Sequence, residues 1–181
     1  MEQLNMLVEK LSKVLLVIGG IAIILMMLHI SIDVASKYLL GHSINGTLEI
    51  VAWYYMISCV FLPLAYVQAR RQNLTVELFT GGLPDRAKSL IDGIVALASI
   101  AYTGLLTSLV FQRAVKSTVE WEIQDVTYFD MPVWPVRWIL PLSFGLMSLV
   151  FLLQGIQDLR FAITGRGRPS FDETQKSSLQ V

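Results

Sequence analysis

The sequence predicts an all-α integral membrane protein with four transmembrane helices, an N-terminal interfacial amphipathic segment and both termini in the cytoplasm. Of the 181 residues, 54% are apolar and 15% are charged, whereas soluble domains carry about 25% charged residues. The mean hydropathy is +0.60. A soluble domain of this composition would expose large apolar patches. The composition therefore favours a membrane protein.

Four apolar stretches are long enough to cross a bilayer. A hydrocarbon core about 30 Å thick is spanned by about 20 helical residues. The stretches that qualify are 14–32, 50–67, 93–111 and 138–156, and none contains Lys, Arg, Asp or Glu. The first exceeds the usual apolar length of a secretory signal and no small-residue cleavage site follows it, so we expect an uncleaved helix. We expect residues 1–165 to form one four-helix membrane domain.

The distribution of Lys and Arg predicts the orientation, because cytoplasmic loops keep an excess of both. Four lie in the two opposite connections, 33–49 and 112–137, which are therefore expected to face the exterior. The other ten lie in the N-terminal segment, the middle loop and the C-terminal tail: Lys10, Lys13, Arg70, Arg71, Arg86, Lys88, Arg160, Arg166, Arg168 and Lys176. These three segments are expected to be cytoplasmic.

The connections carry local signals of their own. Leu4, Leu7, Val8 and Leu11 recur at helical spacing, which predicts an amphipathic segment at the cytoplasmic interface. Gly41 and Gly46 bracket a break before the second span. Helical spacing continues beyond 111, so the third helix is expected to extend past the membrane. Pro84 and Asp85 mark the start of that helix, and the polar tail 166–181 is expected to be disordered and cytoplasmic.

The residue inventory argues against several classes of function. A formal net charge of zero is not typical of a nucleic-acid-binding protein, so we expect no nucleic acid among the partners. One cysteine, Cys59, excludes an internal disulfide or a multi-cysteine metal cluster. The two histidines, His29 and His42, lie in no metal-binding motif, and phosphate-loop and nucleophile motifs are missing. We expect no enzyme activity, no metal and no cofactor.

Polar residues gather at the ends of the predicted spans. Asp33, Lys37 and Tyr38 follow the first span, and Asp33 and Lys37 are four residues apart, so they share a helix face on which they can pair. Glu49 begins the second span, where a helix N-terminus favours an anion. Two interpretations remain open: solvated anchors at the interface, or polar groups that bind another membrane subunit.

Three stretches, in register along residues 10–160, resemble the small membrane subunit of TRAP transporters, the DctQ-like family. The first is 33–49, with Lys37-Tyr38 and Gly46-Thr47-Leu48-Glu49. The second is 69–84, in which Asn73 and Glu77 stand where the family commonly has His and Asp, before Leu83-Pro84. The third is 131–145, similar to the family's Pro-x-Trp approach to the last span.

This resemblance implies a secondary uptake system of the bacterial inner membrane, driven by an ion gradient that is usually sodium. It implies three partners: a large elevator-type membrane subunit, a periplasmic protein that delivers a carboxylated solute, and the lipid bilayer. The chain would then be a scaffold for the large subunit. The expected partner-facing residues are Asp33, Lys37, Tyr38, Gly46 and Glu49 outside, with Asn73 and Glu77 inside.

The binding protein has its own candidate contacts, Glu120, Glu122 and Asp125 in the loop 112–137, for which solvated loop charge is the alternative. The residues argue against two other functions. A self-sufficient small membrane carrier would call for a carboxylate inside the membrane, and the four apolar stretches lack one. A membrane enzyme or redox subunit would call for paired histidines, which His29 and His42 do not supply.

Overall fold

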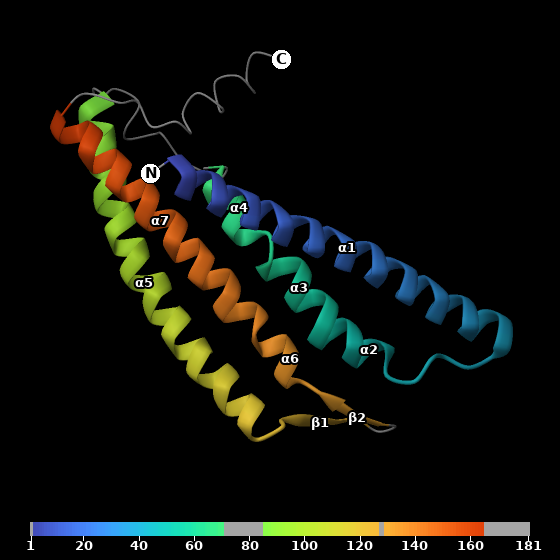
Figure 1. Ribbon diagram of the computed structural model, residues 1–181. Coiled ribbons are helices and arrows are strands. Elements are labelled where there is room, and N and C mark those ends of the chain that lie inside the picture. Colours follow the sequence, from blue (N-terminus) through green and yellow to red (C-terminus); the bar gives the residue numbers. More distant parts are fainter. Residues whose placement is uncertain (1, 71–84, 127–128, 165–181) are drawn as a thin grey trace, which may run out of the picture.

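The computed structural model describes residues 2–70, 85–126 and 129–164 (Figure 1). Within these residues, four helices are long and apolar enough to cross a membrane: Asn5–Leu40, Thr47–Ala69, Ser89–Val119 and Trp134–Ile163. This confirms the four predicted spans. Each helix is longer than its predicted apolar stretch, because helical hydrogen bonding continues into the more polar residues at both ends. Pro84, Asn73, Glu77 and the tail 166–181 lie outside the described residues.

The first two spans differ in regularity. Helix α1 (Glu2–Leu40) is one uninterrupted helix. The second span consists of α2 (Thr47–Ile50), a π-helical turn η1 (Val51–Tyr55), α3 (Met56–Phe61) and α4 (Leu64–Ala69). The interruption between α3 and α4 lies at Pro63, whose nitrogen carries no hydrogen to donate to the helical ladder.

The second half of the chain adds a hairpin that the all-helical prediction lacked. Helix α5 (Asp85–Val119) runs past its apolar stretch, as expected, and leads into β1 (Ile123–Val126) and β2 (Phe129–Pro132). The strands pair antiparallel, with Val126 opposite Phe129 and Asp125 opposite Asp130. Helices α6 (Trp134–Arg137) and α7 (Ile139–Thr164) follow. Four-residue strands are too short to produce a strong sequence pattern.

The spans form an open arrangement in which α1 diverges from the others (Figure 1). The start of α1, the end of α4, the start of α5 and the end of α7 share one end of the molecule, here called the terminal end. The hairpin lies at the opposite end, here called the hairpin end. Both termini of the described fold therefore share one end, as a four-span chain requires. Which end is cytoplasmic stays a prediction.

Helices α5 and α7 form the most extensive pair, and small residues line their seam. A β-carbon on Gly93 would lie 2.7 Å from Cδ2 of Leu159, and one on Gly155 would lie 3.0 Å from Cβ of Ala96. Small residues let helix backbones approach closely in a membrane, where packing rather than hydrophobicity drives association. The seam is therefore a product of these glycines.

Helix α1 packs on the second span through a second glycine contact. A β-carbon on Gly19 would lie 3.2 Å from Cγ of Pro63. Beside this contact, the Ser143 hydroxyl of α7 donates a hydrogen bond to the carbonyl of Phe61, at the interruption of the second span. The break at Pro63 thus joins α1, α3 and α7 near the middle of the bundle.

The predicted amphipathic segment is the first part of α1 rather than a separate element. Val8 and Ser12 are buried against the bundle, whereas Leu7 and Leu11 are about half exposed. The exposed leucines are available to an apolar environment. The location of this segment at the membrane surface stays a prediction.

Candidate interaction surfaces at the two ends

The corner between α1 and α2 is held by side chains of α1. The Asp33 carboxylate accepts a hydrogen bond from the backbone N–H of Ile44 at 2.5 Å, and the Ser36 hydroxyl donates to the carbonyl of His42 at 2.9 Å. Within the described residues, no ion pair joins Asp33 to Lys37. Asp33 therefore positions the corner, a function that its helical spacing from Lys37 did not indicate.

The neighbouring candidates remain open to solvent or to a partner. Tyr38 is 85% exposed, Lys37 is also exposed, and Glu49 is half-buried. Tyr38 and Lys37 lie at the end of α1, where the helix projects away from the rest of the bundle (Figure 1). Partner contact at these three side chains is a prediction that the fold leaves open.

Gly46 has an intramolecular contact. It is buried, with a φ of 86°, and a β-carbon there would lie 2.7 Å from Cζ of Phe129 in β2. Close by, the Tyr54 hydroxyl donates a hydrogen bond to the carbonyl of Pro132. The hairpin is thus packed on the α1–α2 corner and on the second span. These contacts connect the two halves of the chain at the hairpin end.

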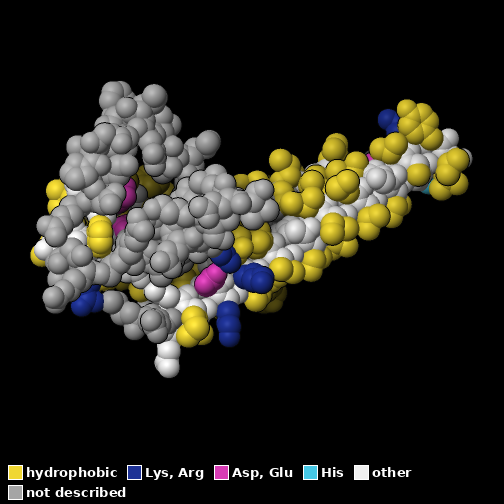
Figure 2. Space-filling view, turned by 90° about the horizontal axis from the view of Figure 1, so that it is seen from above, with side chains coloured by type: hydrophobic (Ala, Val, Ile, Leu, Met, Phe, Trp, Pro, Cys, Tyr) yellow, Lys and Arg dark blue, Asp and Glu magenta, His cyan; other side chains and the backbone are white. Residues whose placement is uncertain are grey.

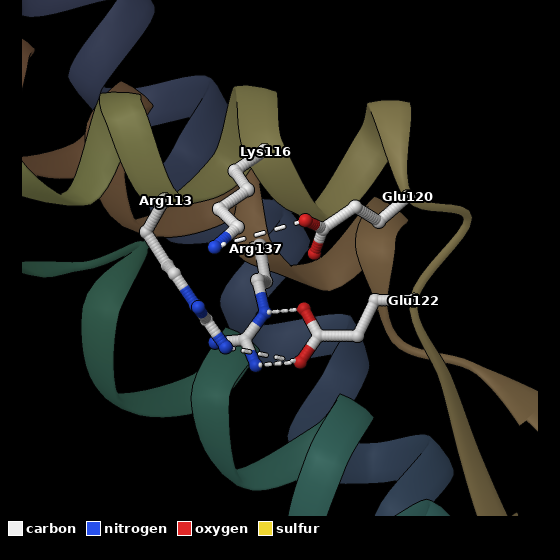
Figure 3. A network of polar contacts seen from close by, with 5 residues as sticks. All are labelled: Arg113, Lys116, Glu120, Glu122 and Arg137. Carbon is white, nitrogen blue, oxygen red and sulfur yellow. Dashed lines mark hydrogen bonds and ion pairs between the residues drawn. The ribbon is translucent and has the colours of Figure 1, made fainter.

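Glu122 is the centre of an ion-pair network (Figure 3). Arg137 donates two hydrogen bonds to its carboxylate, both at 2.6 Å, and Arg113 lies 3.4 Å from the same group. The hydrogen bonds from Arg137 are the main cause that lowers the pKa of Glu122 from 4.5 to about 2. This carboxylate ties the start of the hairpin to α6 and α5, so its principal partners lie within the chain.

Glu120 and Asp125 differ from Glu122 in their surroundings. Glu120 is 57% exposed and its only close cation among the described residues is Lys116, 3.7 Å away (Figure 3). Asp125 is exposed and lies directly across the hairpin from Asp130. Like charges directly opposite in a hairpin destabilise it. Of the three predicted binding-protein contacts, these two leave their carboxylates available.

A buried polar cluster at the terminal end was missed by sequence reasoning. The Gln68 amide donates to Oε1 of Gln154 at 2.8 Å, and the Gln154 amide donates back to the carbonyl of Gln68 at 2.9 Å. Both side chains are buried, and so is Asp158 one turn beyond Gln154. The fourth apolar stretch is defined by its lack of charged residues, and this criterion does not single out the uncharged Gln154. A polar side chain in such a stretch is the signal that indicates a helix–helix hydrogen bond.

Arg70 closes this end of the second span. Its guanidinium lies 2.9 Å from the Glu9 carboxylate of α1 and 5.5 Å from the ring centre of Tyr66. Together with the glutamine pair, this contact joins α1, α4 and α7. The terminal end and the hairpin end are thus both fastened by polar contacts.

The described residues show no group of three or more His, Cys, Asp or Glu side chains that could hold a metal ion. His29 lies edge-on to the Tyr55 ring, with the ring centres 5.9 Å apart. This histidine is therefore in a packing contact between α1 and η1.

Most of the surface between the two ends is apolar. Figure 2 shows hydrophobic side chains along most of the arm formed by α1, with Lys and Arg side chains toward its ends. On α5, Ile94, Leu105 and Leu109 are each more than half exposed. Extensive exposed apolar faces on long helices define the chain as a four-span membrane protein whose faces contact lipid or protein.

The family follows from comparison with known proteins. Residues 26–161, about three quarters of the chain, match the family described as tripartite ATP-independent periplasmic transporters, DctQ component. The chain belongs to this family, as its sequence motifs indicated, and it is therefore a component of a transporter. Neither the curated proteins nor the solved structures contain a match to it.

Proposed function

We propose that this chain is the small permease subunit of a TRAP transporter and that it scaffolds a large, elevator-type membrane subunit. The observation that carries the proposal is the family match over 26–161, combined with the exposed apolar face of α5. A membrane subunit that binds a larger one needs apolar area beyond that which packs its own helices.

The interior of the bundle supports a scaffold rather than a carrier. The seams contain glycine contacts and hydrogen-bonded glutamines, such as the pair Gln68 and Gln154. Carriers place substrate and ion sites at broken helices or ionisable groups near the middle of the membrane. The break at Pro63 is instead filled by packing against Gly19 and by the hydrogen bond from Ser143.

The proposed system imports a carboxylated solute with a sodium gradient, and a periplasmic binding protein delivers that solute. In this proposal the complex lies in a bacterial inner membrane, with the terminal end in the cytoplasm and the hairpin end in the periplasm. The excess of Lys and Arg around the terminal end supports this orientation. The partner-facing residues are then Lys37, Tyr38 and Glu49 at the hairpin end.

Affinity purification tests the proposal. The tagged chain is extracted from its native membranes in mild detergent, and the proteins that accompany it are identified by mass spectrometry. We expect one much larger polytopic protein at equal stoichiometry. The same tag on an unrelated four-span protein is the control. A chain that is recovered alone, and that transports a solute by itself in liposomes, would be a small carrier instead.

A further inference from the structure

We propose that the first half of α1 binds an anionic phospholipid, with the headgroup at two lysines and an acyl chain along the helix beyond them. The site, here called the α1 lipid track, consists of Lys10, Lys13, Val17, Ile21, Ile24 and Leu28. Figure 2 shows Lys and Arg side chains at the base of the arm formed by α1, and hydrophobic side chains along most of the arm beyond them. The inference goes beyond the proposed transport function, because the occupant is a lipid rather than a subunit.

The six residues of the α1 lipid track share one narrow side of the helix. Helix α1 is uninterrupted from Glu2 to Leu40, so a period of about 3.6 residues applies throughout, and the six positions lie within a sector of about 80°. Both lysines are exposed, and the four aliphatic side chains are each more than half exposed. A ligand on this side of α1 can therefore contact the cations and the aliphatic side chains at the same time.

The two lysines provide positive charge that the described fold does not neutralise. None of the ion pairs and hydrogen bonds between described residues uses the ammonium group of Lys10 or Lys13. The carboxylate nearest to them in the sequence, that of Glu9, pairs instead with Arg70 at 2.9 Å. Like charges on neighbouring turns of one helix face repel each other, so this pair of lysines favours an anion beside it. The phosphate of an anionic lipid headgroup is such an anion.

The lysines also lie at the depth of a headgroup. Lys13 directly precedes the apolar stretch 14–32, which occupies the hydrocarbon core when the helix crosses a membrane. From Val17 to Leu28 the helix rises about 16 Å, at roughly 1.5 Å per residue. Half of a hydrocarbon core is about 15 Å thick. A lipid whose phosphate contacts the lysines can thus extend one chain over the whole aliphatic part of the track, within a single leaflet.

The aliphatic part of the track suits an acyl chain better than a partner helix. Contacts between helices in membranes are enriched in small residues and in polar side chains that hydrogen-bond across the interface. The four aliphatic members of the track, from Val17 to Leu28, are large and carry no polar group. Lys and Arg side chains next to a transmembrane segment attract anionic lipids. The charged part and the aliphatic part of the track therefore indicate the same occupant.

Native mass spectrometry of the full chain tests the site. The purified chain is titrated in mild detergent with phosphatidylglycerol, or with zwitterionic phosphatidylethanolamine that has the same acyl chains, and we expect tighter binding of phosphatidylglycerol. The double variant Lys10→Gln, Lys13→Gln is expected to weaken that binding about thirtyfold, or about fivefold per lysine. The double variant Lys10→Arg, Lys13→Arg keeps both charges, and Lys116→Gln removes a cation at the hairpin end. Both controls should bind phosphatidylglycerol like the wild type.

Three results would overturn the inference. The first is equal binding of the two lipids, or undiminished binding by the Lys10→Gln, Lys13→Gln variant. The second is binding of inorganic phosphate as tight as that of phosphatidylglycerol, since the aliphatic part of the track would then contribute nothing. The third comes from a photoreactive residue in place of Ile24 in native membranes, where we expect crosslinks to lipid and where crosslinks to a protein instead would contradict the site. The titrations use this chain without the large subunit, so their outcome is independent of the proposed function.

Discussion

Phe129 of the hairpin packs on Gly46 in the corner between α1 and α2, in the space that a side chain at position 46 would occupy. This contact couples two connections that are more than 80 residues apart in the sequence. Since Gly46 also has a φ of 86°, it meets two requirements at once. It adopts a left-handed conformation, and it leaves room for an aromatic ring.

These two requirements can be separated by substitution. Gly46→Ala is expected to destabilise the chain through both strain and collision, by about 2–4 kcal/mol. Gly41→Ala is the matched control, because Gly41 has a φ of 80° but open space around its α-carbon. The Gly41→Ala variant should lose only the part of the unfolding free energy that backbone strain removes, about 1 kcal/mol. Thermal unfolding in detergent measures both, and equal losses would contradict the packing role of Phe129.

Adjacent glycines in α1 permit a second matched comparison. Gly19→Leu is expected to push α1 away from Pro63, because a β-carbon at position 19 already lies 3.2 Å from the proline ring. Overpacking of this kind costs about 1–3 kcal/mol. Gly20→Leu should leave the unfolding temperature unchanged, since its β-carbon meets no atom within 4 Å. If the two variants unfolded at the same temperature, the α1 packing described above would be wrong.

The glutamine pair at the terminal end makes a third prediction. Gln154→Leu removes the hydrogen bonds that join Gln154 to Gln68, and a buried amide that loses such partners costs about 1–3 kcal/mol. Gln157→Leu, three residues further along α7, is the control. The buried Oε1 of Gln157 has no hydrogen-bond partner among the described residues, so its removal should be neutral or stabilising. Chemical denaturation in mixed micelles distinguishes the two, and a greater loss for Gln157→Leu would refute the assignment.

The Glu122 network predicts how stability depends on pH. Arg137 lowers the pKa of Glu122 in the folded chain from 4.5 to about 2, so folding favours the ionised carboxylate. The stabilisation is therefore complete above pH 4.5 and is lost as the pH falls from 4.5 toward 2. The Glu122→Gln variant lacks this contribution at every pH.

The unfolding temperatures of wild type and Glu122→Gln should differ at about pH 6 and converge at about pH 2 to 3. Glu120→Gln is the control, because Glu120 is 57% exposed and its cation lies 3.7 Å away, an arrangement that contributes little. A difference between wild type and Glu122→Gln that did not change with pH would show that Glu122 acts through packing rather than charge.

The membrane spans could be predicted from the sequence because length and apolarity alone decide whether a helix can cross a bilayer. The break around Gly41 and Gly46 was equally visible, and both glycines have a positive φ. The family was recognisable because its motifs lie in order along the chain, and the match over 26–161 confirms it.

The parts that escaped prediction depend on contacts between distant residues. Asp33 seemed placed to pair with Lys37 on one helix face, but it accepts a hydrogen bond from Ile44, eleven residues away. Glu122 was expected to be a binding-protein contact or a solvated loop charge, but its carboxylate pairs with Arg137. Gln68 and Gln154 form a pair only because α4 packs on α7. Helical spacing describes neighbours along one element and gives no information on these tertiary partners.

The most direct test of the scaffold role is reconstitution of uptake in liposomes, with a sodium gradient and the loaded binding protein outside. We predict sodium-dependent uptake when this chain and the large subunit are both present. We predict none above background when either is omitted. Undiminished uptake by the large subunit alone, or uptake by this chain alone, would contradict the assignment of this chain as an obligatory scaffold.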